Sequence, residues 1–128
     1  MIDDTGIFRT DIEIESHTRR GESRLLRGVL VDTGAEYSSV PASVLDELGI
    51  ERVKRVRFQQ ADGTVLERAM GYAIVRAGGA ETSDDVVFGE RNDLVLLGAR
   101  TLEGMNLKLE IVAKRLVPAG PVPTAAAA

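Results

Sequence analysis

Hydrophobic and polar residues alternate along much of the chain, which predicts a protein built mainly from β-strands. In residues 8–15 every second side chain is charged and the others are apolar or Thr, the period of two that a strand with one buried face produces. A turn is expected at residues 19–23. Residues 25–31 form a second, more continuous apolar run, and residues 35–40 form a third candidate strand.

Two short helices are expected between the strands. Pro41 suits the first turn of a helix, where no amide donor is needed. The apolar side chains of residues 44–48 share one helical face, and Gly49 supplies a stop. Residues 98–105 form the second candidate helix. Many short strands with few helices favour a closed or folded-over β architecture.

A hairpin signal lies in the middle of the chain. Residues 61–64 read Ala-Asp-Gly-Thr, and the Asp-Gly pair tolerates the positive φ of a tight turn. Extended segments over residues 52–60 and 65–75 flank this turn. A further turn is expected at Gly78-Gly79, followed by a strand over residues 86–88.

The remaining strands are short. Residues 94–97 are apolar throughout, so we expect them to be buried on both faces. Residues 107–111 alternate between apolar and charged side chains. A turn at residues 113–115 leads into residues 116–117.

The end of the chain differs in composition from the rest. Residues 118–128 contain three prolines and no charged side chain, which predicts a tail without a core of its own. A chain of 128 residues suffices for one domain. We expect that domain over residues 1–117, followed by a flexible Pro- and Ala-rich tail.

Composition narrows the function classes. A hydrophobic content of 44% fits a globular protein, and a net charge of -4 gives no basic footprint for nucleic acid. The absence of cysteine excludes disulfides, thiolate metal sites and cysteine nucleophiles. The single histidine, His17, has no second histidine to complete a triad or a zinc site, and its neighbours predict a solvated loop. We expect neither a metal ion nor another cofactor.

Charged segments are expected at the surface. The acidic pairs Asp46-Glu47 and Asp84-Asp85 predict solvated surface rather than a metal site, and the basic residues of 52–57 predict a strand face. No apolar run approaches the roughly 18 residues of a membrane helix, and residues 1–11 lack an apolar signal core. We expect a cytoplasmic protein without a membrane partner.

The chemically informative segment is residues 28–35, in which an apolar strand delivers Asp32 into a turn that contains Gly34. Burial at the strand end raises the free-energy cost of charge on Asp32. Gly34 lets a substrate backbone or another chain approach closely, and Thr33 offers a hydroxyl for a hydrogen bond. One carboxyl group does not act as a general acid and a general base at the same moment. A second must stand beside it, and the two share one proton.

This segment resembles the retropepsins, the retroviral-type aspartic peptidases, and their single-lobe bacterial relatives. The resemblance includes a second motif, Leu96-Leu97-Gly98, followed by the short helix bearing Leu102, and spans about residues 24–117. It implies an all-β, closed, barrel-like fold with one or two short helices, active as a homodimer. In that family the second motif packs behind the catalytic turn.

The resemblance also implies roles for single residues. Asp32 corresponds to the catalytic acid, Thr33 to the hydrogen-bonded grip across the dimer axis, and Gly34 to a contact with the substrate backbone. Ala35 matches the family's small residue. Glu36 stands where retroviral members often carry an Asp that binds the substrate main chain.

The hairpin tip corresponds to the family's flap, which closes over substrate, so Ala61, Asp62 and Gly63 are implied to contact substrate. One departure concerns the second motif. Retroviral members follow its glycine directly with Arg, whereas here Ala99 intervenes and Arg100 comes one position later.

A second Asp-Thr-Gly triplet begins at Asp4. Only three residues precede it, so no buried strand delivers it, and the separation from Asp32 is too short for the two lobes of a pepsin-like chain. We interpret Asp4 as part of a frayed terminus. The missing second acid is therefore expected from an identical chain related by a two-fold axis.

The leading hypothesis is an aspartic endopeptidase that hydrolyses extended polypeptides with a water activated between two copies of Asp32. The first alternative is a non-catalytic dimerisation or peptide-binding module on the same fold. A second is a nucleotide-phosphate loop of the sugar-kinase and actin type, which requires two domains and a longer chain. The simplest alternative is that Asp32-Thr33-Gly34 is only a turn that ends a strand.

Overall fold

The computed structural model describes residues 8–123, and strands dominate this part of the chain. The strands are β1 (Phe8–Glu15), β2 (Ser23–Val31), β3 (Ser38–Pro41), β4 (Lys54–Gln59), β5 (Val65–Ala77), β6 (Ala80–Gly89), β7 (Leu96–Leu97), β8 (Leu107–Glu110) and β9 (Arg115–Pro118), and the helices are α1 (Ala42–Glu47) and α2 (Ala99–Gly104). Neither described helix, at six residues each, is long and apolar enough to cross a membrane.

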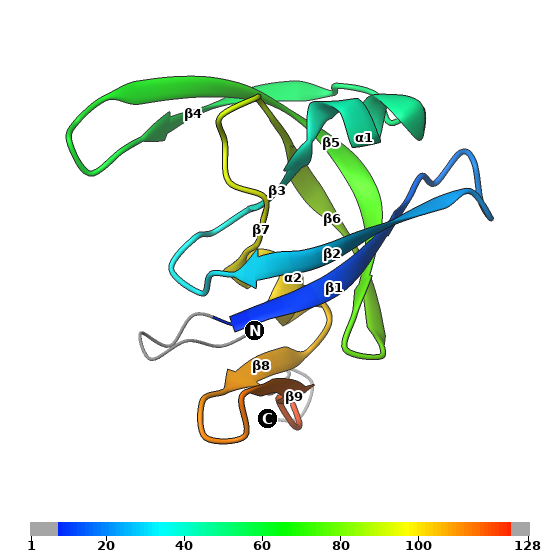
Figure 1. Cartoon of the computed structure of the whole chain (residues 1–128), viewed down its shortest axis with the longest axis vertical. Coiled ribbons are helices and arrows are strands. Elements are labelled where there is room, and N and C mark those ends of the chain that lie inside the picture. The colour runs from blue at the N-terminus through cyan, green and yellow to red at the C-terminus, as the bar shows by residue number, and fades with distance from the viewer. Residues whose placement is uncertain (1–7, 124–128) are drawn as a thin grey trace.

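The main sheet closes on itself. Its strand order is β1-β2-β7-β3-β6-β5-β4, and β1 pairs with β5 as well as with β2. Six strands therefore form a ring, while β4 extends from β5 as the outer strand of a long hairpin (Figure 1). The predicted mostly-β, closed fold with two short helices is confirmed.

The alternation in β1 produces the burial that the sequence predicts. Ile12 and Ile14 are fully buried in the ring, whereas Arg9 and Asp11 face solvent. A bulge interrupts the pairing with β2 opposite Asp11, where Gly28 adopts a φ of 64°. The Asp11 carboxylate accepts a hydrogen bond of 2.9 Å from the Gly28 amide. This bulge bends β2 shortly before it reaches Asp32.

Apolar side chains from the strands and both helices fill the ring. The side chains with 0–1% exposure include Ile12, Ile14, Val40, Leu45, Val75, Val86 and Leu97. The predicted helix after Pro41 is present, but Pro41 is its N-cap and the last residue of β3 instead of part of its first turn. Gly49, with a φ of 74°, ends this helix as predicted.

Two apolar positions next to strand ends are exposed. Leu94 is 67% exposed and precedes β7, so residues 94–97 are not buried throughout. Ile111 is 77% exposed because it lies in the turn between β8 and β9. In both cases the apolar run continues beyond the hydrogen-bonded strand, and alternation alone does not mark where pairing stops.

The β8–β9 hairpin forms a separate two-stranded sheet at the opposite end of the molecule from the β4–β5 hairpin (Figure 1). Its Leu107 is buried, and Leu116 packs against the core. Pro118 belongs to β9, and the Ala119 amide donates to the Asn106 carbonyl at 2.8 Å. The division into a domain and a tail at residue 118 stays a prediction.

Candidate functional site

The two sequence motifs meet at the end of β2. Strands β2 and β7 are parallel neighbours, with Val31 opposite Leu97. The Asp32 amide then donates a hydrogen bond of 2.9 Å to the Leu97 carbonyl. Leu97 is fully buried, so the backbone that carries Asp32 rests against the core.

The loop after Asp32 is fixed to the start of α2 by its backbone. The Ala99 amide donates to the Ala35 carbonyl at 2.8 Å, and the Arg100 amide donates to the Glu36 carbonyl at 2.9 Å. Gly98 permits this approach, because a Cβ there would lie 2.6 Å from the backbone of Tyr37. The second motif therefore lies directly behind the Asp32 loop.

The Asp32 residue is half-buried. Its Oδ1 atom accepts a hydrogen bond of 2.9 Å from the Gly34 amide. Thr33, Gly34 and Glu36 are exposed in the single chain. The Asp-Thr-Gly turn is thus presented at the molecular surface rather than enclosed.

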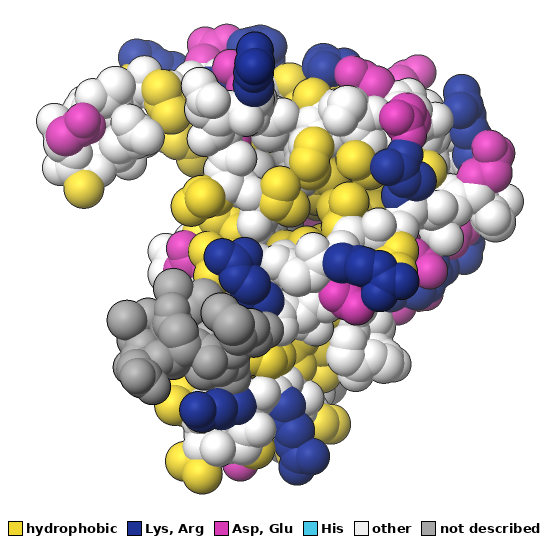
Figure 2. Space-filling model, in the orientation of Figure 1, with side chains coloured by type: hydrophobic (Ala, Val, Ile, Leu, Met, Phe, Trp, Pro, Cys, Tyr) yellow, Lys and Arg dark blue, Asp and Glu magenta, His cyan; other side chains and the backbone are white. Residues whose placement is uncertain are grey.

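The β4–β5 hairpin projects from the body, and the surface is hollowed beneath it (Figure 2). Its turn is held by two backbone bonds between Gln60, Gly63 and Thr64, and Gly63 adopts a φ of 88°. The Asp62 carboxylate accepts the Thr64 amide at 2.9 Å. Hydrogen bonds from the Thr64 amide and hydroxyl lower the pKa of Asp62. Asp62 therefore shapes the turn itself.

A cavity of about 810 Å³ lies between this hairpin and the Asp32 loop. The predicted site residues that line it are Asp32, Gly34, Ala35, Glu36, Ala61 and Leu96. Thr33, Asp62 and Gly63 lie outside the lining, and Leu97 and Gly98 are buried behind it. The structure brings most of the predicted set to one cavity of the single chain.

Several lining residues escaped the sequence analysis. Tyr37 and Phe58 form an edge-to-face pair with ring centroids 5.9 Å apart, and Leu66 lies opposite Phe58 in the β4–β5 register. The alternation of β4 could have located Phe58, because it places Val56 and Phe58 on one face of the hairpin. The exposed Leu94 also lines the cavity, which explains its position outside the core.

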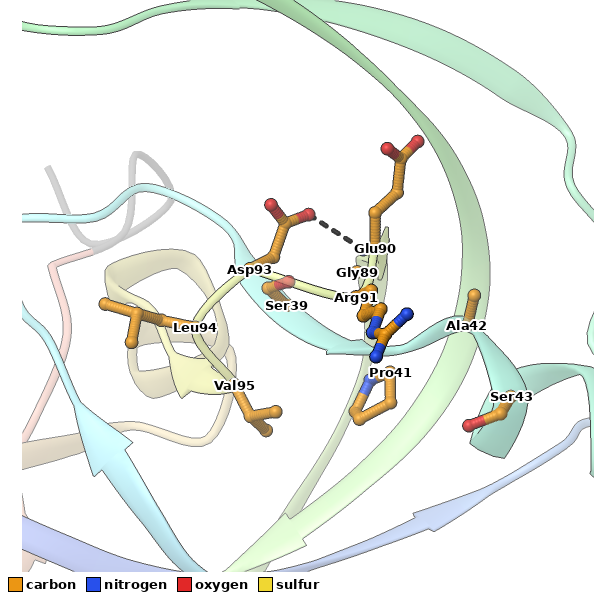
Figure 3. A pocket seen from close by; sticks show the side chains of 10 residues that line it. All are labelled: Ser39, Pro41, Ala42, Ser43, Gly89, Glu90, Arg91, Asp93, Leu94 and Val95. Carbon is orange, nitrogen blue, oxygen red and sulfur yellow. Dashed lines mark hydrogen bonds between the residues drawn. The ribbon is translucent and has the colours of Figure 1, made fainter.

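A charge pair joins the hairpin to the loop of residues 90–95. Arg68 of β5 donates to Asp93 through Nε at 2.7 Å and through Nη2 at 3.0 Å. The Glu90 amide also donates to Asp93 at 2.8 Å (Figure 3). The Arg68 hydrogen bonds are the main reason that the pKa of Asp93 is lowered. We call this pair the Arg68–Asp93 clamp.

An adjoining cavity of about 530 Å³ shares Ser39, Asp93 and Leu94 with the first (Figure 3). Pro41 and Arg91 are among its other lining residues, and Asp32 is not. Both cavities are apolar to a large degree. Since only the first combines Asp32 with the hairpin, we take that cavity as the candidate active site.

A family model described as "gag-polyprotein putative aspartyl protease" matches residues 27–104, more than half of the 128-residue chain. The chain belongs to this retropepsin-like family. The match includes Asp32-Thr33-Gly34, the β4–β5 hairpin and the second motif. No curated protein matches the chain.

The retropepsin-like chain differs from the retroviral pattern at Arg100, which follows Gly98 after one intervening residue. The Arg100 guanidinium lies 5.1 Å from the centre of the Tyr37 ring and 3.8 Å from Asp84. Asp84 was expected at the solvated surface, but its side chain is only 10% exposed because the Arg100 and Thr101 side chains contact it.

Asp4 lies outside the described residues. His17 is exposed and contacts Ser83 at 2.8 Å, and neither residue lines the 810 Å³ cavity.

Proposed function

We propose that this chain is an aspartic endopeptidase, active when Asp32 of two subunits meets across a two-fold axis. One observation carries the proposal: Thr33 and Gly34 are exposed while Asp32 opens into the cavity beneath the hairpin. A turn with this exposure is accessible to the same turn of a second copy, and two-fold symmetry pairs like with like. Membership of an aspartyl protease family supports the same activity.

The chemistry requires both carboxyl groups. Paired Asp32 side chains share one proton because two like charges at close range do not both ionise freely. The ionised group takes a proton from water, whose oxygen attacks the carbonyl carbon, and the protonated group gives its proton to the carbonyl oxygen. The first carboxyl group then gives the proton it took from water to the nitrogen, one diol hydroxyl gives its proton to the second, and the C–N bond breaks, which restores the shared proton of the pair. The products are a carboxylic acid and an amine.

The substrate class follows from the cavity. Strand β4 and the hairpin turn border an open groove that suits an extended polypeptide. Tyr37, Phe58, Leu66 and Leu94 give the groove apolar walls, so apolar substrate side chains adjacent to the scissile bond fit best. Arg68 and Asp93 neutralise one another within the lining.

The proposal is tested by cleavage of a denatured protein. Asp32→Asn should abolish cleavage while Asp4→Asn retains it. When Asp32→Asn is mixed in equal amount with wild type under subunit exchange, about one pair in four keeps both carboxyl groups, so wild-type activity should fall to about half. Equal activity of the two single variants, or activity unaffected by mixing, contradicts the proposal. Tight peptide binding without cleavage from acidic to neutral pH would favour the peptide-binding module instead.

A further inference from the structure

Three polar side chains from distant parts of the chain form a buried hydrogen-bonded row behind the candidate site. Ser38 of β3 and Thr101 of α2 are both 0% exposed, and their hydroxyl oxygens lie 2.5 Å apart. Thr101 donates to Asp84 of β6 at 3.0 Å, and the Gly98 amide donates to the Ser38 oxygen at 2.9 Å. We call these side chains the Asp84–Thr101–Ser38 row.

The hydrogen bonds of the row all run in one direction, from the Gly98 amide as donor to the Asp84 carboxylate as final acceptor. The Gly98 amide only donates, so the Ser38 oxygen accepts from it. An ionised carboxylate only accepts, so Thr101 donates to Asp84, which also accepts the Asp85 amide at 2.8 Å. The remaining proton, between Ser38 and Thr101, therefore comes from Ser38. Each hydroxyl donates once and accepts once, and such a row polarises every bond in it.

The row ends at the backbone that holds Asp32. Gly98 follows Leu97, whose carbonyl accepts the Asp32 amide at 2.9 Å, and precedes Ala99, whose amide binds the Ala35 carbonyl. A shift of Gly98 would therefore move both supports of the Asp32 loop. Apolar side chains could fill the same space without the desolvation cost of two hydroxyls and a carboxylate. They would not fix the Gly98 amide in one orientation.

We propose that Asp84, Thr101 and Ser38 are positioning residues that orient Gly98 and, through it, the Asp32 carboxyl. The effect on catalysis rests on the proposed peptidase function, whereas the effect on Gly98 does not. Placement of a reacting group matters because a misplacement of about 1 Å can lower a rate by roughly a hundredfold.

Thr101→Val tests the proposal, because it keeps the shape of the side chain but removes the acceptor of Ser38 and the donor to Asp84. Under conditions in which the variant is fully folded, kcat should fall about tenfold or more with KM little changed. Hydrogen exchange of the Gly98 amide, followed by NMR, should accelerate. Thr101→Ser restores the hydroxyl and should recover most of both properties. Ser83→Ala removes an exposed hydroxyl beside Asp84 on β6 and serves as the matched control.

The outcomes separate the row from the proposed function. Wild-type kcat in folded Thr101→Val, or no recovery in Thr101→Ser, overturns the proposal. If Thr101→Val does not fold, Asp84→Asn is measured in its place. The side-chain amide of this variant can donate as well as accept, so it no longer fixes the direction of the hydrogen bonds in the row. Its kcat should then fall, and its Gly98 exchange should accelerate. If the wild type cleaves nothing, the peptidase function fails, and unchanged Gly98 exchange in the variants would then overturn the row as well.

Discussion

The Arg68–Asp93 clamp gives a prediction that links stability to the candidate site. Arg68→Met keeps most of the aliphatic stem and removes the guanidinium, which leaves the Asp93 carboxylate with the Glu90 amide as its remaining described partner. The clamp consists of two bonds, at 2.7 and 3.0 Å. The Arg68 and Asp93 side chains are 15% and 23% exposed, so solvent screens the pair only partly.

The expected loss in the free energy of unfolding is about 2 kcal/mol. A hydrogen bond to a charged group contributes roughly 1.5–3 kcal/mol when buried, and an exposed ion pair contributes at most about 1 kcal/mol. The partial burial of the clamp places it between these limits. Arg55→Met is the matched control on the same hairpin, because the Arg55–Glu67 pair has side chains 58% and 50% exposed. Its loss should be much smaller.

Urea denaturation measures both variants, with Asp93→Asn and the double variant completing a cycle. The cycle should give a coupling energy of about 1–2 kcal/mol between Arg68 and Asp93. Because the folded pKa of Asp93 lies below its usual value of 3.8, its contribution is complete above that pH and is lost as the pH falls through the folded pKa. This acid-dependent loss should disappear in Arg68→Met. Equal destabilisation by Arg68→Met and Arg55→Met, or zero coupling, would refute the reasoning.

Two further predictions concern the core of the ring and the second motif. Hydrogen bonds from Arg20, then Arg76 and the Gly21 amide, lower the pKa of Glu15 from 4.5 to about 2, so its stabilising effect is complete above pH 4.5 and is lost between 4.5 and about 2. Glu15→Gln should therefore flatten the dependence of unfolding free energy on pH over that interval. If urea denaturation at several pH values gives the same pH dependence as for the wild type, these hydrogen bonds to Glu15 are not its cause. Gly98→Ala adds a Cβ 2.6 Å from the Tyr37 backbone, and should lower stability by about 1–3 kcal/mol and reduce kcat; retention of both by calorimetry and kinetics would contradict the close packing.

The sequence predicted the features that depend on neighbouring residues. The alternation of β1, the turn at residues 60–64 and the stop of α1 at Gly49 all follow from local pattern and local φ requirements. Whether an apolar run faces the core or the surface cavity was less predictable. Leu94 was expected in the core but lines the cavity, because the residue at which β7 begins is set by its partner strands rather than by its own residues.

The polar interior could not be predicted from local sequence. Asp84 reads as a surface residue beside Asp85, but Thr101 reaches it from α2, and Ser38 reaches Thr101 across 63 positions of sequence. The Arg68–Asp93 clamp joins residues 25 positions apart. The pairing of β1 with β5, which closes the ring, is likewise a long-range contact. Such partners become visible only once the strands are arranged in space.

The two sides of the candidate site are held by different forces, and this predicts how the site responds to acid. Backbone bonds from Asp32, Ala99 and Arg100 fix the Asp32 loop, and amide–carbonyl bonds do not titrate in the acid range. The hairpin side is held to the loop of residues 90–95 by the Arg68–Asp93 clamp, which weakens as Asp93 takes a proton. Falling pH should therefore loosen the cover of the cavity while the Asp32 loop keeps its geometry. On the proposed function, the paired Asp32 carboxyl groups would then keep their placement under acid conditions that mobilise the β4–β5 hairpin.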